Sequence, residues 1–190
     1  MKIYLIRHGE TDYNRQHLFY GKTDVSLNET GVQQSYFLKE KLADMKVDTP
    51  VYTSSLKRTI ETGKLIFPNH SMISLKELDE KDFGLWEGLN ADQINKEFPM
   101  EWNKWLLSPF EVTPTNAEKF SDFQDRILKC VREILLKKHD FILVGHLGVL
   151  RVILKNCFPA YKFWEIALEQ GNYTMIEVEE SDFKIIAWNK

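Results

Sequence analysis

The sequence predicts an α/β fold with three layers, α/β/α, around a mostly parallel central sheet. The first observation is that short apolar runs typical of strands alternate with helix-like segments along the chain. The second is the segment over residues 121–138, whose apolar side chains recur at helical spacing and predict a helix that packs on the sheet. The third is a pair of alternating runs near the C-terminus, which predicts a hairpin on the edge of the same sheet.

The first half of the chain contains two strand-and-helix units. The run IYLI predicts a strand over residues 3–6, and a helix follows over about 29–45. The run VYT predicts a second strand over 51–53, and a helix follows over about 54–67. Strands that are separated by helices in this way are expected to lie parallel to one another.

The second half adds a further parallel strand and the hairpin. The run FILVG predicts a buried strand over 141–145, and a helix follows Gly148. The runs YTMIEVE, at 173–179, and FKIIAW, at 183–188, flank the turn-like EESD and form the predicted hairpin.

Residues 79–119 depart from this pattern. They form short, aromatic-rich segments that Pro99, Pro109 and Pro114 interrupt, and they predict a small helical insertion over the active site. A length of 190 residues is that of one domain, so we expect residues 1–190 to form a single domain that includes the insertion.

Composition excludes several classes of function. A net charge of -3 at pH 7 provides no field that would attract a nucleic acid. The longest uncharged apolar run, 141–150, is too short to span a bilayer, and the N-terminal apolar run is too short for a signal peptide. Cys130 and Cys157 lie in apolar helical segments and are expected to be reduced thiols. We therefore expect a soluble cytoplasmic protein, either a monomer or a homodimer, that acts on a small molecule.

The candidate chemistry lies where the predicted parallel strands end, the place where such sheets bind ligands. Arg7, His8 and Asn14 follow the first strand, Arg58 lies just after the second, and His146 follows the third. Guanidinium groups match phosphate oxygens, and a neutral imidazole can attack phosphorus. These residues therefore predict a phosphate site with histidine as the nucleophile.

The leaving oxygen in such a reaction also needs a proton. The segment ELDEKDFGLWEG supplies carboxyl candidates for this acid, namely Glu77, Asp79, Glu80, Asp82 and Glu87.

Four motifs together resemble the histidine phosphatase superfamily, the phosphoglycerate mutase-like enzymes, over nearly the whole chain. LIRHGETDYN resembles the segment with the nucleophilic histidine, and YTSSLKRTIET resembles the segment with the second phosphate-binding arginine. EKDFGLWEG resembles the proton-donor segment, and ILVGHLGVLR resembles the segment with the second histidine. The resemblance implies a metal-independent phosphatase that needs no cofactor and passes through a phosphohistidine.

Carried over by position, the resemblance assigns a role to each motif residue. His8 is the implied nucleophile, and Glu80 is the general acid and base. The implied phosphate ligands are Arg7, Arg58, His146 and Asn14.

Two positions depart from the superfamily pattern. Leu147 stands where a glycine is common; its backbone N–H can still bind an anion, while its side chain narrows the pocket. Lys119 stands where a serine that contacts the substrate is more usual in the family.

The stretch FYGKTDVSLNETG and the ending LEQGNYTMIEVE are most similar to one branch, the alpha-ribazole phosphatases of cobalamin nucleotide-loop assembly. This similarity implies alpha-ribazole 5'-phosphate as the substrate and adds Thr23 as a substrate contact. The substrate ring is then expected on Trp86 and Trp102, although packing of the insertion is the favoured alternative for these tryptophans and for Trp105.

Other residues and functions remain open. His17, His70 and His139 are interpreted as surface residues, and Asp82 and Glu87 either support the site or face solvent. A metal-binding triad, a catalytically silent phosphate-binding module, a mutase and a broad-specificity phosphatase are the alternatives. Paired arginines argue against a divalent metal, and a mere binding module needs neither His8 nor Glu80.

Overall fold

A computed structural model describes residues 1–180 and 182–190 and contains a six-stranded mixed sheet in the order β3-β2-β4-β1-β5-β6. The strands are β1 (Lys2–Arg7), β2 (Val51–Thr53), β3 (Met72–Ser74), β4 (Phe141–Gly145), β5 (Tyr173–Glu179) and β6 (Asp182–Ala187). Strands β1 to β4 are parallel, β5 is antiparallel to β1, and β6 is antiparallel to β5. The predicted mostly parallel sheet with a C-terminal edge hairpin is confirmed.

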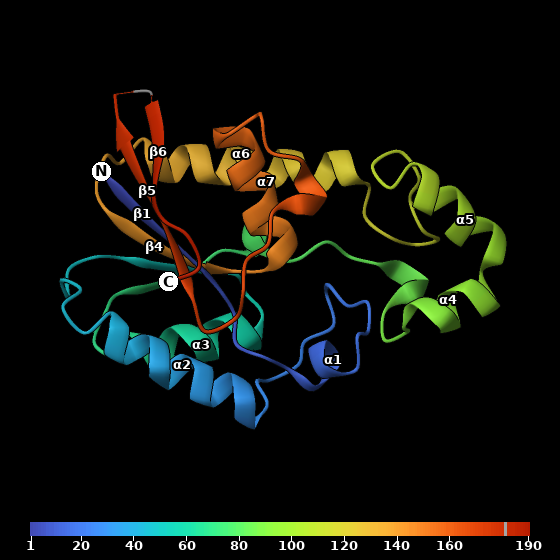
Figure 1. The fold of residues 1–190 in the computed structure, drawn as a ribbon, viewed down its shortest axis with the longest axis horizontal. Coiled ribbons are helices and arrows are strands. Elements are labelled where there is room, and N and C mark those ends of the chain that lie inside the picture. Colours follow the sequence, from blue (N-terminus) through green and yellow to red (C-terminus); the bar gives the residue numbers. More distant parts are fainter. Residues whose placement is uncertain (181) are drawn as a thin grey trace.

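Helices cover both faces of the sheet, as Figure 1 shows. Helices α2 (Glu29–Lys41) and α3 (Lys57–Ile66) lie on one face, and α6 (Phe120–Leu135) and α7 (Leu147–Cys157) lie on the other. The core on the α2 and α3 face contains Leu38, Ile66, Phe67, Ile142 and Val144. The core on the α6 and α7 face contains Phe123, Ile127, Ile134, Leu143, Leu150 and Ile153. The uninterrupted apolar run of β4 is explained by this burial on both faces.

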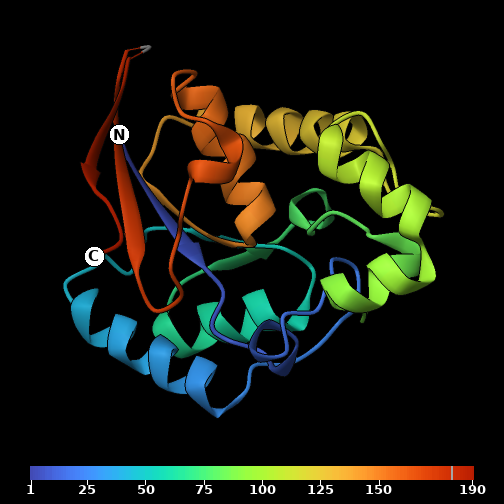
Figure 2. The same cartoon turned by 45° about the vertical axis from the view of Figure 1, so that its right-hand side comes forward.

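The insertion contains α4 (Ala91–Glu97) and α5 (Pro99–Leu107). These two helices and the short α1 (Asp12–Arg15) lie beyond the end of β1, away from the hairpin, in both Figure 1 and Figure 2. The aromatic side chains of the insertion pack on Phe19, whose ring centroid lies 5.8 Å from that of Trp102 and 6.1 Å from that of Trp105. The insertion is therefore attached to the segment that follows α1.

The structure differs from the sequence prediction in two short elements and in the first residues of two helices. Helix α1 and strand β3 are not predicted, because four and three residues are too few to show a periodic pattern. The helix after β2 begins at Lys57 rather than Ser54. The helix after β4 begins at Leu147, one residue before Gly148, with His146 in the N-cap position.

Both cysteines are free thiols. Burial raises the pKa of Cys130 to about 11 and that of Cys157 to about 12, so both thiols are protonated at neutral pH. In the part of the chain that the structure describes, no helix is both long and apolar enough to cross a bilayer.

Candidate active site

The three predicted strand ends meet because β2, β4 and β1 are neighbours in the sheet. Arg7 at the end of β1 pairs with Gly145 at the end of β4, and Thr53 at the end of β2 pairs with Val144. The residues that follow are therefore brought together, and the ring centroids of His8 and His146 lie 5.2 Å apart.

A cavity of about 570 Å³ opens at this edge of the sheet. Its lining includes most of the predicted site residues, namely Arg7, His8, Asn14, Arg58, Glu80, His146 and Leu147. It also includes residues that the sequence did not single out for this role, namely Glu10, His17, Leu18, Phe19, Tyr20, Phe83 and Gln170. Thr23, Trp86 and Trp102 do not line this cavity.

His8 is held as the neutral tautomer that has a free lone pair on Nε2. Its Nδ1 lies 2.8 Å from the carbonyl oxygen of Gly9, and because a carbonyl only accepts, Nδ1 carries the proton. Burial, reinforced by the charges of Arg58 and Arg7, lowers the pKa of His8 well below the ordinary 6.5. The unprotonated Nε2 is the nitrogen that a nucleophilic imidazole uses.

Arg58 is fully buried beneath the cavity without a carboxylate partner. Its guanidinium donates to the carbonyls of Thr23 at 2.8 Å and Gly21 at 2.7 Å, and its Nε donates to Nδ1 of His146 at 3.2 Å. It lies over the ring of Tyr20, 4.6 Å from the centroid. Its direct hydrogen-bond partners are all neutral, so Arg58 is free to pair with an anion in the cavity.

Arg7 provides a second guanidinium group that forms no ion pair among the described residues. One terminal nitrogen donates to the carbonyl of Leu168 at 3.1 Å, whereas the buried Nε has no hydrogen-bond partner among the described residues. None of the ion pairs found among residues 1–180 and 182–190 includes Arg7 or Arg58. Two guanidinium groups that form no ion pair, with Arg58 buried and Arg7 partly buried, are suited to bind a phosphate dianion.

His146 is also neutral. Because its Nδ1 accepts from Arg58, its Nε2 carries the proton and donates to Ser54 Oγ at 2.8 Å. Burial and the charge of Arg58 lower the pKa of His146 well below 6.5. The two hydrogen bonds fix the ring beside His8.

Glu80 combines a raised pKa with a fixed orientation. Its two carboxyl oxygens accept from the backbone N–H groups of Lys81 at 3.0 Å and Gly148 at 2.9 Å. Burial raises the pKa of Glu80, although these hydrogen bonds and the charges of Arg58 and Arg126 oppose the rise. A carboxyl group that retains its proton to higher pH is suited to act as a general acid.

Asn14 has an orientation that the surrounding donors determine. Its Oδ1 accepts from the backbone N–H of Thr11 at 3.2 Å and from Nε2 of Gln170 at 2.9 Å, and the Tyr20 hydroxyl lies 3.0 Å away. Because these donors require an oxygen, the Nδ2 amino group lies on the other side of the amide and can donate to an anion.

The proposed stacking role of Trp86 is wrong. Trp86 has no exposed surface, and its ring packs against Phe19, Trp102 and Trp105, with the last two centroids 5.4 Å and 5.6 Å away. Trp102 is stacked on Trp105 at 5.5 Å. The packing alternative therefore describes Trp86 and Trp102, neither of which lines the cavities beside Glu80.

Thr23 contacts the site through its backbone. Its carbonyl accepts from Arg58, and its hydroxyl donates to Glu87. Asp82 and Glu87, which the sequence left as either supporting or solvent-facing, both support neighbouring loops. Glu87 accepts from backbone N–H groups, and Asp82 pairs with Lys22 at 2.8 Å.

The remaining histidines are partly as expected. His17 and His139 are exposed, but His17 also lines the cavity. His70 is not a freely exposed residue: it is partly buried and packs edge-on against Phe67, with centroids 5.0 Å apart. The sequence does not show that His17 lines the cavity. Its position depends on the folded loop, in which the backbone of His17 is left-handed, with φ of 54°.

A second, apolar cavity of about 250 Å³ adjoins the first. The two share Phe19, Glu80, Phe83 and Leu147. The other walls are mainly aromatic and include Trp105, Phe120, Phe123, Phe163 and Trp164, together with Arg151. A group attached to a phosphate beside His8 therefore has an aromatic subsite next to Glu80.

Among the residues that the structure describes, no three or more His, Cys, Asp or Glu side chains are grouped so that they could hold a metal ion. His8, His146 and Glu80 thus do not form a ligand triad in this geometry.

Comparisons with known proteins identify the family of this chain. The profile of the histidine phosphatase superfamily (branch 1) matches residues 3–190. The chain is 27% identical over 186 residues to the adenosylcobalamin/alpha-ribazole phosphatase of Escherichia coli K12, covering 95% of this chain and 91% of that protein. It is 31% identical over 195 residues to a metal-independent phosphoserine phosphatase of Arabidopsis thaliana, covering 99% and 81%.

The fold is similar to the crystal structure of the alpha-ribazole phosphatase from Shigella flexneri. The TM-score is 0.93 at 26% identity, and the match covers 100% of this chain and 96% of that one. The chain belongs to the histidine phosphatase superfamily, branch 1.

Proposed function

We propose that this chain hydrolyses phosphomonoesters through a phosphohistidine at His8, and that alpha-ribazole 5'-phosphate is its substrate. The observation that carries the catalytic part is the joint presence, in one cavity, of a neutral imidazole, two unpaired guanidinium groups and a carboxyl group with a raised pKa. These groups supply the nucleophile, the anion clamp and the acid that phosphoryl transfer requires.

In the first step the lone pair on Nε2 of His8 attacks phosphorus, and the bond from phosphorus to the ester oxygen breaks. Glu80 gives its proton to that oxygen, which leaves as an alcohol. Arg7 and Arg58 stabilise the charge on the transferring phosphoryl group, and the Asn14 amino group donates to it. The hydrogen bond from Nδ1 to the Gly9 carbonyl stabilises the positive charge that develops on the ring.

In the second step the Glu80 carboxylate accepts a proton from water, whose oxygen attacks phosphorus. The bond between phosphorus and Nε2 breaks and returns the lone pair to His8, releasing inorganic phosphate. Glu80 is then protonated again, so one residue acts as acid and base in turn.

The aromatic subsite supports the substrate assignment. Its walls suit a flat, apolar ring on the leaving group, and the proteins from Escherichia coli and Shigella flexneri named above are alpha-ribazole phosphatases. The aromatic side chains proposed to contact the substrate ring are therefore Phe19, Phe83, Trp105 and Trp164 rather than Trp86 and Trp102.

Phosphoserine is the second candidate substrate. Arg151 lies in the same subsite, where its guanidinium is suited to pair with a carboxylate on the leaving group. The Arabidopsis thaliana relative is a phosphoserine phosphatase. The predominantly apolar walls favour the aromatic substrate over this zwitterion.

The test is kcat/KM, without added metal ion, for alpha-ribazole 5'-phosphate, phosphoserine, 3-phosphoglycerate, fructose 2,6-bisphosphate and a purine mononucleotide. Alpha-ribazole 5'-phosphate is expected to be best by at least about tenfold, which is about 1.4 kcal/mol of transition-state stabilisation. A smaller margin refutes this substrate assignment and leaves the phosphatase proposal in place. Failure to hydrolyse any of the esters refutes both.

We further propose that the protein acts in the cytoplasm on a small molecule rather than on nucleic acid, as a monomer or homodimer. The two free cysteines and the net charge of -3 support this proposal.

A further inference from the structure

We propose that Glu87 is a positioning residue for Arg58 and acts through the backbone of residues 21–23, here called the 21–23 loop. The proposal rests on the proposed function, since it takes Arg58 as a phosphate ligand. Glu87 itself lines neither the phosphate cavity nor the aromatic subsite.

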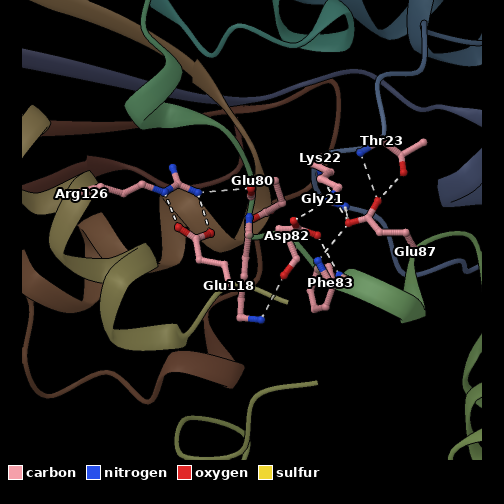
Figure 3. A network of polar contacts seen from close by, with 11 residues as sticks. Gly21, Lys22, Thr23, Glu80, Asp82, Phe83, Glu87, Glu118 and Arg126 are labelled. Atoms are coloured by element: carbon pink, nitrogen blue, oxygen red, sulfur yellow. Dashed lines mark hydrogen bonds and ion pairs between the residues drawn. The ribbon is translucent and has the colours of Figure 1, made fainter. Parts of the chain in front are cut away.

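The carboxylate of Glu87 gathers donors from two loops, as Figure 3 shows. Oε1 accepts from the backbone N–H groups of Gly21 at 2.7 Å, Lys22 at 3.2 Å and Phe83 at 3.0 Å. Oε2 accepts from the backbone N–H of Thr23 at 3.1 Å and from the Thr23 hydroxyl. Three consecutive N–H groups of the 21–23 loop therefore point to one carboxylate.

The carbonyl groups of the same loop hold Arg58. Nη2 of Arg58 donates to the Gly21 carbonyl at 2.7 Å, and Nη1 donates to the Thr23 carbonyl at 2.8 Å. With the loop's N–H groups committed to Glu87, the Gly21 and Thr23 carbonyls are oriented toward the guanidinium. Both terminal nitrogens of Arg58 thus depend on a loop conformation that Glu87 stabilises.

The same carboxylate links Arg58 to the segment that carries Glu80. The Phe83 N–H belongs to that segment, and Gly21 lies so close to it that a Cβ on Gly21 would be 1.6 Å from the Lys81 carbonyl oxygen. Glu87 therefore joins the loop behind the phosphate clamp to the loop that presents the proposed acid.

A carboxylate suits this position because five donors converge on two oxygens that can both accept. Glutamine has only one acceptor oxygen, and its amino group, in place of the second carboxylate oxygen, would face N–H donors. Glu87→Gln therefore changes the loop contacts while nearly conserving side-chain volume.

A control exists elsewhere in the chain. Oε2 of Glu101 accepts from the backbone N–H of Thr115 at 3.0 Å and from the Thr115 hydroxyl at 2.7 Å. This repeats the contact of Glu87 with Thr23 at a loop that does not contact Arg58. Glu101→Gln removes a comparable carboxylate clamp and tests for a general effect on stability.

The experiment is a double-mutant cycle in the full-length protein. The competitive inhibition constant of orthovanadate, a mimic of the transferring phosphoryl group, is measured for wild type, Glu87→Gln, Arg58→Ala and the double variant, with Tm recorded for each. Glu87→Gln is expected to weaken orthovanadate binding about tenfold when Arg58 is present and less than about twofold in the Arg58→Ala background. Glu101→Gln is expected to change binding by less than about twofold.

Equal losses in both backgrounds show that Glu87 does not act through Arg58 and overturn the proposal, as does a wild-type inhibition constant in Glu87→Gln. If Glu87→Gln does not fold, Thr23→Val replaces it in the cycle, because it removes one donor to Glu87 and keeps the backbone contacts. A loss of orthovanadate binding that depends on Arg58 then supports the proposal, and an equal loss in both backgrounds overturns it. Failure of the wild type to bind orthovanadate refutes the phosphate site itself, and so separates failure of the proposed function from failure of the positioning role.

Discussion

The backbone N–H of Gly148 donates to Oε2 of Glu80 at 2.9 Å, and a Cβ on Gly148 would lie 2.4 Å from Oε1 of the same carboxyl group. Gly148 is the second residue of α7, so the carboxyl group lies against the first turn of that helix. The positive end of the helix dipole and a free N–H favour an acceptor there. The close approach is possible because position 148 has no side chain.

We therefore predict that Gly148→Ala displaces the Glu80 carboxyl group and lowers kcat for alkyl phosphates at least about tenfold. Alanine favours helix more than glycine does, so the loss should not come from a weakened α7. The control is Gly63→Ala in α3, where a Cβ meets the flexible end of Met72 at 3.0 Å and does not meet Glu80. Unchanged kcat in Gly148→Ala contradicts the prediction; Tm distinguishes misfolding from displacement.

The site was largely predictable because parallel strands end at one edge of a sheet, so that residues next to each predicted strand end must be neighbours in space. His8, Arg58 and His146 each follow a predicted parallel strand and so are expected side by side, and the resemblance distinguishes Glu80 from the other four carboxyl candidates. The cavity lining confirms that these residues are brought together.

The parts that were not predictable depend on contacts between segments distant in sequence. Gln170 reaches Asn14 across 156 positions, and no local pattern indicates this contact. The tryptophans of the insertion are a similar case, because the sequence does not show which of them is buried. The packing on Phe19 buries Trp86, whereas Trp105 lines the subsite.

The neutral state of His8 leads to a prediction about the intermediate. A denaturing quench at alkaline pH, where a phosphohistidine is stable, should trap label on His8 after rapid mixing with phosphate-labelled substrate in the absence of added metal ion. His8→Ala should trap none, whereas His139→Ala, a substitution of an exposed histidine outside the cavity, should trap as much as wild type. Loss of labelling on treatment with a chelator and its recovery with a divalent ion would contradict a metal-independent reaction.

The raised pKa of Glu80 leads to a prediction about leaving groups. Glu80→Gln should lower kcat for alkyl phosphates by about 100- to 10,000-fold, the usual contribution of general acid catalysis. It should affect p-nitrophenyl phosphate much less, because that leaving group needs little protonation. Equal losses on both esters, measured in parallel kinetic assays, would assign the acid to another carboxylate, with Asp82 as the next candidate.

The aromatic subsite predicts that Trp164 contributes to recognition of a substrate ring. Trp164→Ala should lower kcat/KM for alpha-ribazole 5'-phosphate by roughly 2- to 12-fold, the equivalent of one aromatic contact, and leave small alkyl phosphates unchanged. Tyr161→Ala is the control, because Tyr161 is 45% exposed, close to the 49% of Trp164, and does not line the subsite. Equal losses for both variants, or equal losses on both kinds of ester, would show that Trp164 acts on stability alone.

The two buried histidines also predict how stability depends on pH. The pKa of His8 and that of His146 are lower in the folded protein than the ordinary 6.5, so below about pH 6.5 the unfolded chain binds more protons at these positions. Their contribution to the free energy of unfolding is thus fully present above about pH 6.5 and is lost as the pH falls. Glu80 acts in the opposite direction, since its raised pKa favours the folded state at low pH, but it is one group against two.

We therefore expect the free energy of unfolding, measured by urea titration between about pH 5 and about pH 7, to fall toward acid pH. In His8→Gln the slope below about pH 6.5 should be smaller by up to about 1.4 kcal/mol per pH unit, because one of the two groups no longer takes up a proton on unfolding. His139→Gln, which changes an exposed histidine, should keep the wild-type slope. A wild-type slope in His8→Gln would show that folding does not lower the pKa of His8, and would contradict the shift assigned here to its burial.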